Sequence, residues 1–425
     1  MYAYGQGVPQ DFQKAVEWFA KAAEQGYPPA QLSLGSMYLM GNGIEQNDGK
    51  AVEWYRKATE QEYAEAQSNL GTMYETGRGV EQDYRKAVEG YRKAAEQGHP
   101  EAQYVLGQIY SEGKGIPQDL EKAFTWWTRS AEQGHANAQA NLGLLYARGN
   151  GIPKDSTKAT EWFKKAAEQG LVDAQFLLGL MYVRGHGVPQ DDQKAMEWYG
   201  KAAEQGFADA QVRLGGMYAI GRGVTQDYQK AFEWFAKAAE QGSAGAQYNL
   251  GFMFEKGQGV EKNNEKAFEW YSQAAEQGFP LAQNSLGGMY EDGLGVPQDY
   301  QKALAWYYKA AEQGNPAALI NIGLMYAYGY GVPQDTQTAI EWCRKAAGQK
   351  LQIANLLINA LQGEAEAQYR LGLMYANAEG FSQDIPKAVA WFQKAADQGH
   401  PDARKQLEKM SSETSENPAS GQAIQ

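Results

Sequence analysis

The strongest constraint on this chain is a 36-residue repeat that governs nearly its whole length. The opening stretch MYAYGQGVPQDFQKAVEW, residues 1–18, returns as MYAYGYGVPQDTQTAIEW at residues 325–342. Fourteen of the eighteen positions match, and the copies lie 324 residues apart, which is nine times 36. Periods of this size indicate stacked supersecondary units, each of which packs only on its neighbours. A repeat array is therefore expected in place of the two or three globular domains that 425 residues would otherwise suggest.

The register of the repeat sets the expected domain organisation. Counted from Ala30, the pattern restarts every 36 residues as far as Ala318; the next starts are Ala367, which lies 49 residues on, and Ala403. We therefore expect ten complete units over residues 30–402, preceded by an incomplete unit over 1–29. An insertion is expected near 349–361, a C-terminal helix stub over 403–410, and a disordered tail over 411–425, which has no apolar periodicity.

Within a unit, two segments carry the pattern of amphipathic helices. In AQSNLGTMY, residues 66–74, the apolar side chains recur at i, i+4, i+7 and i+8, which places them on one stripe of a helix. In DYQKAFEWFAKAAEQG, residues 227–242, they recur at i, i+3, i+4, i+7 and i+8 after Asp227, a good N-cap. Each unit is thus predicted to be a helix hairpin that buries its apolar faces by stacking on the next.

Glycines recur at fixed positions of the hairpin. Gly71 interrupts the first helix and has a counterpart in the other units, although a mid-helix glycine costs about 1 kcal/mol relative to alanine. That repeated cost predicts a close approach of two helices at this position. The following G-x-G, such as Gly77 and Gly79, is predicted to end the helix, since glycine adopts the left-handed cap conformation cheaply.

The full pattern, A-Q-x-x-L-G-x-M-Y-x-x-G-x-G-V-x-Q-D-x-x-K-A-x-x-W-[FY]-x-K-A-A-E-Q-G, resembles the Sel-one-like repeat family, relatives of the tetratricopeptide repeats. The resemblance covers the chain to about residue 410. It implies an all-α fold, an α/α superhelical solenoid of about ten 36-residue helix-turn-helix repeats with a right-handed twist. It also implies a protein-interaction scaffold without chemistry of its own. Some secreted members carry two cysteines per repeat; this chain has only Cys343, so properties of that subgroup are not expected.

Charge and composition exclude several classes of partner. The chain has 39 basic and 51 acidic side chains, a net charge of −12, and no lysine or arginine cluster, which disfavours nucleic acid and anionic lipid as ligands. No apolar run approaches the roughly 20 residues of a membrane span, and the first residues do not read as a signal peptide. We expect a cytoplasmic protein as written, and a secreted or periplasmic one if an upstream signal precedes Met1.

No constellation of residues indicates catalysis. The G-x-G pairs follow a helix rather than a strand, unlike a dinucleotide-binding loop. His99, His135 and His400 occupy one repeat position, and neighbouring repeats place such positions roughly 20 Å apart, too far for a shared metal ion. Cys343 replaces a core aromatic residue and is interpreted as a core filler. We expect no catalytic residue, metal or cofactor, and not an enzyme.

The positions that vary between repeats are free to bind a partner. In the first helix these are the third and seventh positions, with the fourth beside them, and in tetratricopeptide relatives the matching face lines a concave groove. The central candidates are Tyr104, Gln108, Asn141, Leu144, Phe176, Leu180, Val212, Arg213, Tyr248, Asn249 and Phe252. Exposed aromatic side chains are typical anchors, and amide and guanidinium groups bind peptide backbone or carboxylates.

The alternative is that these side chains merely pack against the neighbouring repeat. Position seven, which lies beside the core methionine, is more open to that objection than position three. The leading function is therefore a non-catalytic scaffold or adaptor that binds a protein or peptide along the groove. A carbohydrate- or cell-envelope-associated binding module is the alternative function, since the chain is rich in tyrosine and tryptophan.

Two places depart from the repeat. Gly90 stands where other units have a tryptophan. This difference predicts a local weak point, either a hinge or a pocket filled by a neighbour, and a stabilising effect of Gly90→Trp.

The insertion GQKLQIANLLINALQG carries leucines and isoleucines spaced for a helix with one apolar side. That helix either packs on its own array or serves as a dimer or partner contact.

The start of the chain falls within a repeat. Met1 aligns with a core methionine of the first helix, such as Met37, so the residues that should precede it in that helix are absent. The second helix over residues 11–26 then has an apolar face, including Trp18, that no first helix covers. We expect upstream repeats, and fraying or self-association through this end as written, because solenoids are normally closed by a polar capping unit.

Overall fold

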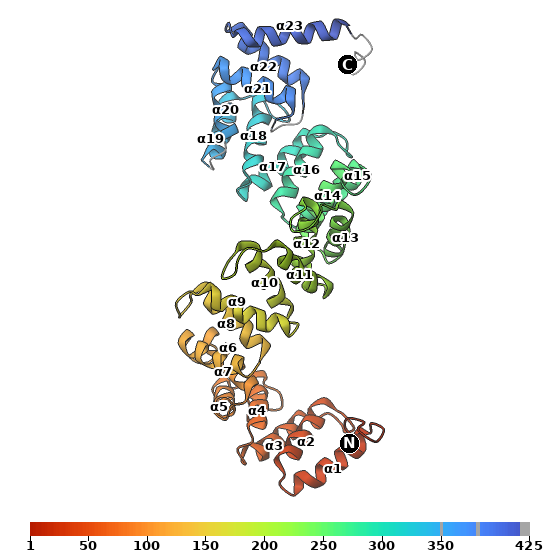
Figure 1. Cartoon of the computed structure of the whole chain (residues 1–425), viewed down its shortest axis with the longest axis vertical. Coiled ribbons are helices and arrows are strands. Elements are labelled where there is room, and N and C mark those ends of the chain that lie inside the picture. Colours follow the sequence, from red (N-terminus) through yellow and green to blue (C-terminus); the bar gives the residue numbers. More distant parts are fainter. Residues whose placement is uncertain (349–351, 380–382, 417–425) are drawn as a thin grey trace. The chain divides into compact units, whose positions relative to one another are not determined.

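The structure, a computed structural model, describes residues 1–348, 352–379 and 383–416. Those residues form helices and turns, and no strand occurs among them. The chain divides into two compact units, Met1–Met217 with Gly221–Thr225, and Tyr218–Ile220 with Gln226–Gln425. Within each unit the helices follow one another as stacked hairpins (Figure 1), which confirms the all-α, repeating helix-turn-helix architecture expected from the sequence.

The described residues form the helices α1 to α23. The first helices in chain order are α1 Phe12–Glu24, α2 Pro28–Met40, α3 Asp48–Thr59, α4 Ala64–Thr76, α5 Tyr84–Glu96, α6 Pro100–Glu112, α7 Leu120–Glu132, α8 Ala136–Arg148, α9 Ser156–Glu168, α10 Val172–Arg184, α11 Asp192–Glu204 and α12 Ala208–Ile220. The remaining helices are α13 Tyr228–Glu240, α14 Ala244–Lys256, α15 Asn264–Glu276, α16 Pro280–Asp292, α17 Tyr300–Glu312, α18 Pro316–Tyr328, α19 Thr336–Ala347, α20 Gln352–Leu361, α21 Ala365–Asn377, α22 Ile385–Asp397 and α23 Pro401–Glu416.

The mid-helix glycine marks the closest approach within a hairpin, as expected. In the hairpin of α10 and α11, a Cβ added to Gly179 would lie 2.7 Å from the ring of Tyr199, which is 1% exposed. Most other hairpins place an aromatic ring of the second helix on the same glycine; in the hairpin of α18 and α19 the sulfur of Cys343 takes that place. The first helix then ends at a glycine in the left-handed conformation, Gly185 with φ +64° after α10.

A buried glutamine connects most hairpins to the one before them. Gln139 at the start of α8 is 4% exposed, and its amide donates to the carbonyl of Ala131 in the preceding hairpin at 3.1 Å. The side-chain oxygen of Gln139 accepts from Gln169 at the end of α9, in its own hairpin, at 2.8 Å. Most hairpins repeat this ladder, which satisfies a polar group that would be costly to bury alone.

The insertion forms the helix α20. Ala354, Leu357 and Ala360 are buried at 0%, 0% and 1% exposure and belong to the core cluster that also holds Cys343 and Trp391. The apolar side of α20 thus packs on its own array, while Gln352, Asn355 and Asn359 are exposed. Residues 349–351, which begin the insertion, lie outside the described residues.

The C-terminal helix is longer than the stub expected from the sequence. Helix α23 continues to Glu416, so residues 411–416, expected to be disordered, are helical. The reason is local: no glycine or proline interrupts the stretch after Pro401 until Pro418, and helical hydrogen bonds do not depend on apolar periodicity. The rest of the expected tail, residues 417–425, lies outside the described residues.

Candidate functional site

All the candidate partner-binding residues lie on first helices of hairpins. In the first unit, α6 carries Tyr104 and Gln108, α8 carries Asn141 and Leu144, α10 carries Phe176 and Leu180, and α12 carries Val212 and Arg213. In the second unit, α14 carries Tyr248, Asn249 and Phe252. None of these side chains is fully buried, and Arg213 and Phe252 are exposed.

The aromatic rings at the third position pack against the following helices of their own unit. Tyr104 stacks on His135 with ring centroids 4.6 Å apart. Phe176 contacts the rings of Tyr199 at 5.6 Å and Phe207 at 5.2 Å. Tyr248 makes the equivalent contacts in the second unit, to Tyr271 and Phe279. One face of each ring therefore stabilises the stack between hairpins.

At the seventh position, Phe252 is more exposed than the aromatic rings at the third position. Phe252 is 38% exposed, and the ammonium group of Lys256 lies 5.9 Å from its ring centroid. Gln108, Leu144 and Leu180 are half-buried. The sequence placed position seven beside the core methionine; the large rings at the third position reach the next hairpin.

A recess of about 350 Å³ opens between α6 and α8. It brings together three of the candidate residues, Gln108, Asn141 and Leu144. Trp127 lies at its base, 5% exposed, with its indole nitrogen donating to the carbonyl of Tyr104 at 3.1 Å. Arg148 and Glu112 stand among the lining side chains. The recess thus offers apolar surface flanked by amide groups and by both signs of charge.

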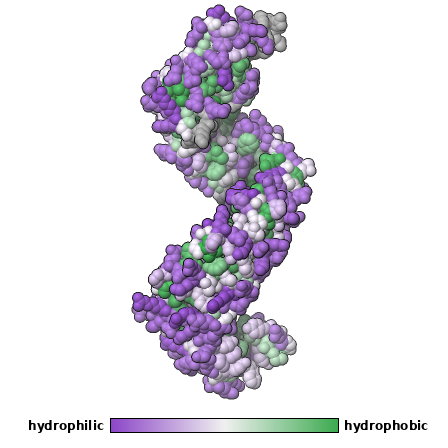
Figure 2. All heavy atoms as spheres, turned by 60° about the vertical axis from the view of Figure 1, so that its left-hand side comes forward, coloured by the Kyte–Doolittle hydropathy of each residue, from purple (hydrophilic) through white to green (hydrophobic). Residues whose placement is uncertain are grey.

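Exposed apolar side chains elsewhere are scattered. On the face shown in Figure 2, apolar side chains form small separate patches within a largely hydrophilic surface. At the N-terminal end, Trp18 is 62% exposed and lines a hollow with Met1, Tyr4 and Phe19. This distribution favours partner contacts at isolated apolar side chains rather than along one broad apolar face.

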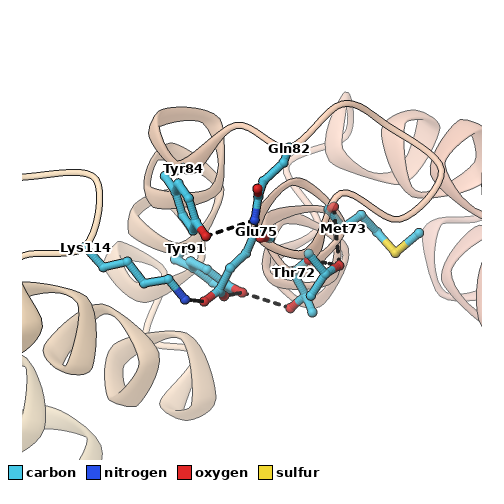
Figure 3. A network of polar contacts seen from close by, with 8 residues as sticks. Thr72, Met73, Glu75, Gln82, Tyr84, Tyr91 and Lys114 are labelled. Atoms are coloured by element: carbon cyan, nitrogen blue, oxygen red, sulfur yellow. Dashed lines mark hydrogen bonds and ion pairs between the residues drawn. The ribbon is translucent and has the colours of Figure 1, made fainter.

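A polar network joins neighbouring repeats in the first unit (Figure 3). The carboxylate of Glu75, at the end of α4, accepts hydrogen bonds from the hydroxyl of Tyr91 in α5 and from the ammonium group of Lys114 after α6, both at 2.7 Å. The hydroxyl of Tyr91 also lies 3.0 Å from that of Thr72. Burial alone would raise the pKa of Glu75, but the bonds from Lys114 and Tyr91 outweigh it and hold this pKa below its ordinary value.

The sequence did not identify a second, more acidic site in the second unit. A cleft of about 550 Å³ is lined by Glu291 and Asp292 at the end of α16 and by Tyr328, Tyr375, Asp384 and Lys387 from α18, α21 and α22. Lys387 pairs with Asp384 at 3.1 Å. These residues lie up to 96 positions apart in the sequence, and no repeat signal relates them. In the sequence, only the two adjacent acidic residues Glu291 and Asp292 could have indicated the cleft.

Glu291 is the counterpart of Glu75 without its lysine. It accepts a hydrogen bond from Tyr307 at 2.7 Å, as Glu75 does from Tyr91, but Tyr330 occupies the repeat position of Lys114. Burial raises the pKa of Glu291 above its ordinary value, with only partial compensation from Tyr307 and Lys387, while Asp292 and Asp384 add repulsion and raise it further. The two glutamates therefore respond to pH in opposite directions.

We expect Glu75→Gln to destabilise α5 at pH 7 and Glu291→Gln to leave α17 as stable or more stable. A lowered pKa means that the Glu75 contribution is present above the ordinary value of 4.5 and is lost as the pH falls through the folded-state value. The penalty from Glu291 is absent below 4.5 and grows as the pH rises through its raised folded-state value.

Hydrogen exchange of α5 and α17 amides at pH 4 and pH 7 measures both effects. For Glu75 the expected loss at pH 7 is about 1 kcal/mol, discounted because Lys114 is partly exposed. Equal protection of α5 in the wild type and in Glu75→Gln at pH 7 would contradict the assignment.

The histidines and the cysteine have structural roles. His99, His135 and His400 accept hydrogen bonds through Nδ1 from the backbone amide three residues on, and so cap their helices. Cys343 is fully buried, and burial raises the pKa of its thiol to about 11, which leaves it protonated and unreactive at neutral pH. In the part of the chain that the structure describes, no three histidine, cysteine or acidic side chains gather as metal ligands.

Among the described residues, no helix combines the length and the apolar character that crossing a bilayer requires.

Comparison with known proteins places these hairpins among known repeats. The family model described as "Sel1 repeat" matches eleven segments, residues 1–27, 28–63, 64–99, 100–135, 136–171, 172–207, 208–243, 244–279, 280–315, 316–350 and 365–400. The register of these segments starts two residues before the one counted from Ala30. A search of the curated proteins returned no match.

Two solved structures are similar over most of the chain. One is c5321, a protective antigen present in uropathogenic Escherichia coli strains that displays an SLR fold; it is 38% identical over 97% of this chain and 86% of its own, with a TM-score of 0.79. The other is a Sel1 repeat protein from Oxalobacter formigenes, 35% identical over 81% of this chain and 89% of its own, with a TM-score of 0.56.

Proposed function

Since this chain belongs to the Sel1 repeat family, whose members generally act as protein-interaction scaffolds, we propose that it is a non-catalytic scaffold that binds a protein or peptide partner along the exposed face of its first helices. The observation that carries the proposal is the recess between α6 and α8, where Gln108, Asn141 and Leu144 meet over Trp127. These are side chains that vary from repeat to repeat, so they are not required to build the solenoid.

The chemistry of the recess favours an extended peptide. The amide groups of Gln108 and Asn141 each offer a donor and an acceptor, which matches the alternating groups of a peptide backbone. Leu144 and Trp127 provide an apolar base for one side chain. Arg148 supplies a charged donor for a carboxylate, either an acidic side chain or a chain terminus. In the second unit, exposed Phe252 offers a separate aromatic anchor.

Substitutions at the seventh position test this proposal best. Polar replacement of Phe176 or Tyr248 would also disturb the stacking between hairpins, because both rings pack on the next helices. Phe252→Lys changes an exposed side chain, and Leu144→Lys changes a half-buried side chain that lines the recess. Peptides are selected from a random display library on the full chain, and their affinities for each variant are then measured by titration calorimetry.

We expect Leu144→Lys or Phe252→Lys to weaken the selected peptides by about tenfold or more, as the loss of an interface anchor does. Lys164→Ala on α9, an exposed second-helix position, is the matched control and should leave affinity unchanged. Unchanged affinity in both lysine variants, with helicity retained, would remove the first-helix face as the binding surface.

A further inference from the structure

One hairpin lacks the tryptophan that every other hairpin carries at the same position of its second helix. Nine of the eleven tryptophans of the chain stand there in hairpins with a complete first helix: Trp54, Trp126, Trp162, Trp198, Trp234, Trp270, Trp306, Trp342 and Trp391. Trp18 occupies the equivalent position in α1. In α5 the residue at this position is Gly90.

The tryptophan has the same packing role in the hairpins that possess it. Trp126 packs on the core cluster that contains Leu106, and Trp162 on the cluster that contains Leu142. The leucine or isoleucine at this position of the first helix is only 0–4% exposed in nine hairpins, namely Leu34, Leu106, Leu142, Leu178, Leu214, Leu250, Leu286, Ile322 and Leu371. Leu70, which faces Gly90, is the exception and is only half-buried.

A positively charged side chain lies over most of these tryptophan rings. Nine of the ten tryptophans at this position have a lysine or arginine three residues on, with its charge 3.7–5.0 Å from the ring centroid. The equivalent residue in α5 is Lys93, which has no ring to stack on and pairs with Glu89 at 2.8 Å. Both partners of that pair are exposed, so the ion pair contributes little and leaves Lys93 free to turn.

The space of the missing ring is open. A hollow of about 270 Å³ lies between α4 and α5, lined by Leu70, Gly71 and Tyr74 on one side and by Gly90 and Lys93 on the other. The sequence allowed a pocket filled by a neighbouring side chain, and the structure corrects that expectation. Engineered cavities of about 150 Å³ with apolar walls bind a benzene ring, so this hollow has room for an aromatic side chain.

The two helices lie close together at this point. A Cβ added to Gly90 would lie 2.8 Å from the carbonyl oxygen of Gln67 and 3.3 Å from the Cα of Gly71. An indole attached to α5 itself must therefore push the two helices apart, and the expected stabilisation by Gly90→Trp is opposed by that cost. A ring that enters from solvent needs no Cβ at Gly90 and meets no such obstacle.

We propose that the hollow at Gly90 is a binding site for a tryptophan side chain presented by a protein or peptide partner. The occupant follows from the chain itself: the other hairpins show which group covers this leucine and which cation stacks on it. The partner's indole covers Leu70, lies against Tyr74 and receives the ammonium group of Lys93 on its face. None of these residues belongs to the first-helix face of the proposed function, so the two sites are tested independently.

The test uses the full chain and N-acetyl-tryptophanamide as the probe. The methyl resonances of Leu70 are followed by NMR during the titration, and N-acetyl-alaninamide serves as the control ligand. We expect saturable shifts at Leu70 with the tryptophan amide and none with the alanine amide. Lys93→Gln should weaken binding roughly two- to fivefold, the amount expected for a cation on an exposed aromatic face.

Gly90→Trp fills the hollow and should abolish the shifts at Leu70 while circular dichroism reports retained helicity. Because that variant separates two helices, Leu70→Gln provides a second one that keeps the backbone spacing; there binding is followed at the methyl group of Thr59, which also lines the hollow, and should weaken at least tenfold. Absence of saturable shifts in the wild type, or equal binding in the wild type and the folded Gly90→Trp variant, would overturn the proposal.

Discussion

Gly179→Val is expected to destabilise the hairpin of α10 and α11 by about 3 kcal/mol. A Cβ at this position lies 2.7 Å from two ring atoms of Tyr199, and valine adds two further methyl groups. Tyr199 is 1% exposed and cannot turn away, so the two helices must separate. Overpacking of a tight core costs typically about 1–3 kcal/mol, and the rigid ring places this site at the upper end.

Gly200→Ala is the matched control for this substitution. Gly200 lies in α11, and a Cβ added there meets nothing within 4 Å. Alanine at this position should therefore stabilise the helix by up to about 1 kcal/mol, through helix propensity alone. Chemical denaturation together with hydrogen exchange of α10 and α11 amides measures both effects. Loss of protection in both variants, or in neither, would contradict the close-approach role assigned to the glycine.

The repeat made the hairpin geometry predictable from sequence. Asp227 caps α13 through its side chain, and Gly77 ends α4 with φ +70°, as the residue types require. Such features depend on neighbours along the chain, and ten copies of the same pattern remove the ambiguity of any single copy. The close approach at Gly71 was predictable for the same reason, because only a steric demand explains a repeated helix-breaking cost.

Side-chain contacts between repeats were not predictable. The hydrogen bond from Lys114 to Glu75 joins residues 39 positions apart. The cleft around Glu291 and Lys387 depends on the position of α21 and α22, which α20 connects to α19. Sequence spacing gives the face of a helix but not the length that a side chain must span. The rings of Tyr104 and Phe176 illustrate this point, since they are long enough to reach the next hairpin.

The binding site at Gly90 was visible in the sequence only as a gap. The missing tryptophan identified the position, whereas the half-buried Leu70 and the tight contact of Gly90 with the backbone of α4 appear only in three dimensions. In a repeat protein, equivalent hairpins can be compared with one another. The effect of a different side chain at one position can therefore be read from the hairpins that carry the usual residue. The same logic applies to Glu75 and Glu291, whose surroundings differ in the lysine at the position of Lys114 and in the acidic neighbours Asp292 and Asp384.

Leu357→Ala is expected to destabilise the C-terminal part of the second unit by about 2–5 kcal/mol. Leu357 lies in the middle of α20, is 0% exposed, and belongs to the cluster shared with Leu371 and Phe392. Truncation of a buried leucine removes apolar burial and leaves a cavity that the neighbours fill only partly. The cost is large because α20 is also the connection on which α21 and α22 depend for their position in the stack.

Asn355→Ala, on the exposed side of α20, is the control and should change stability by less than about 0.5 kcal/mol. Hydrogen exchange of α21 and α22 amides reports the local stability, and light scattering reports the mass in solution. If α20 acts as part of its own array, Leu357→Ala lowers protection and leaves the mass unchanged. If the leucine side of α20 were instead a contact between copies, the substitution would change the mass and leave protection in α21 and α22 intact, and the packing described above would be wrong.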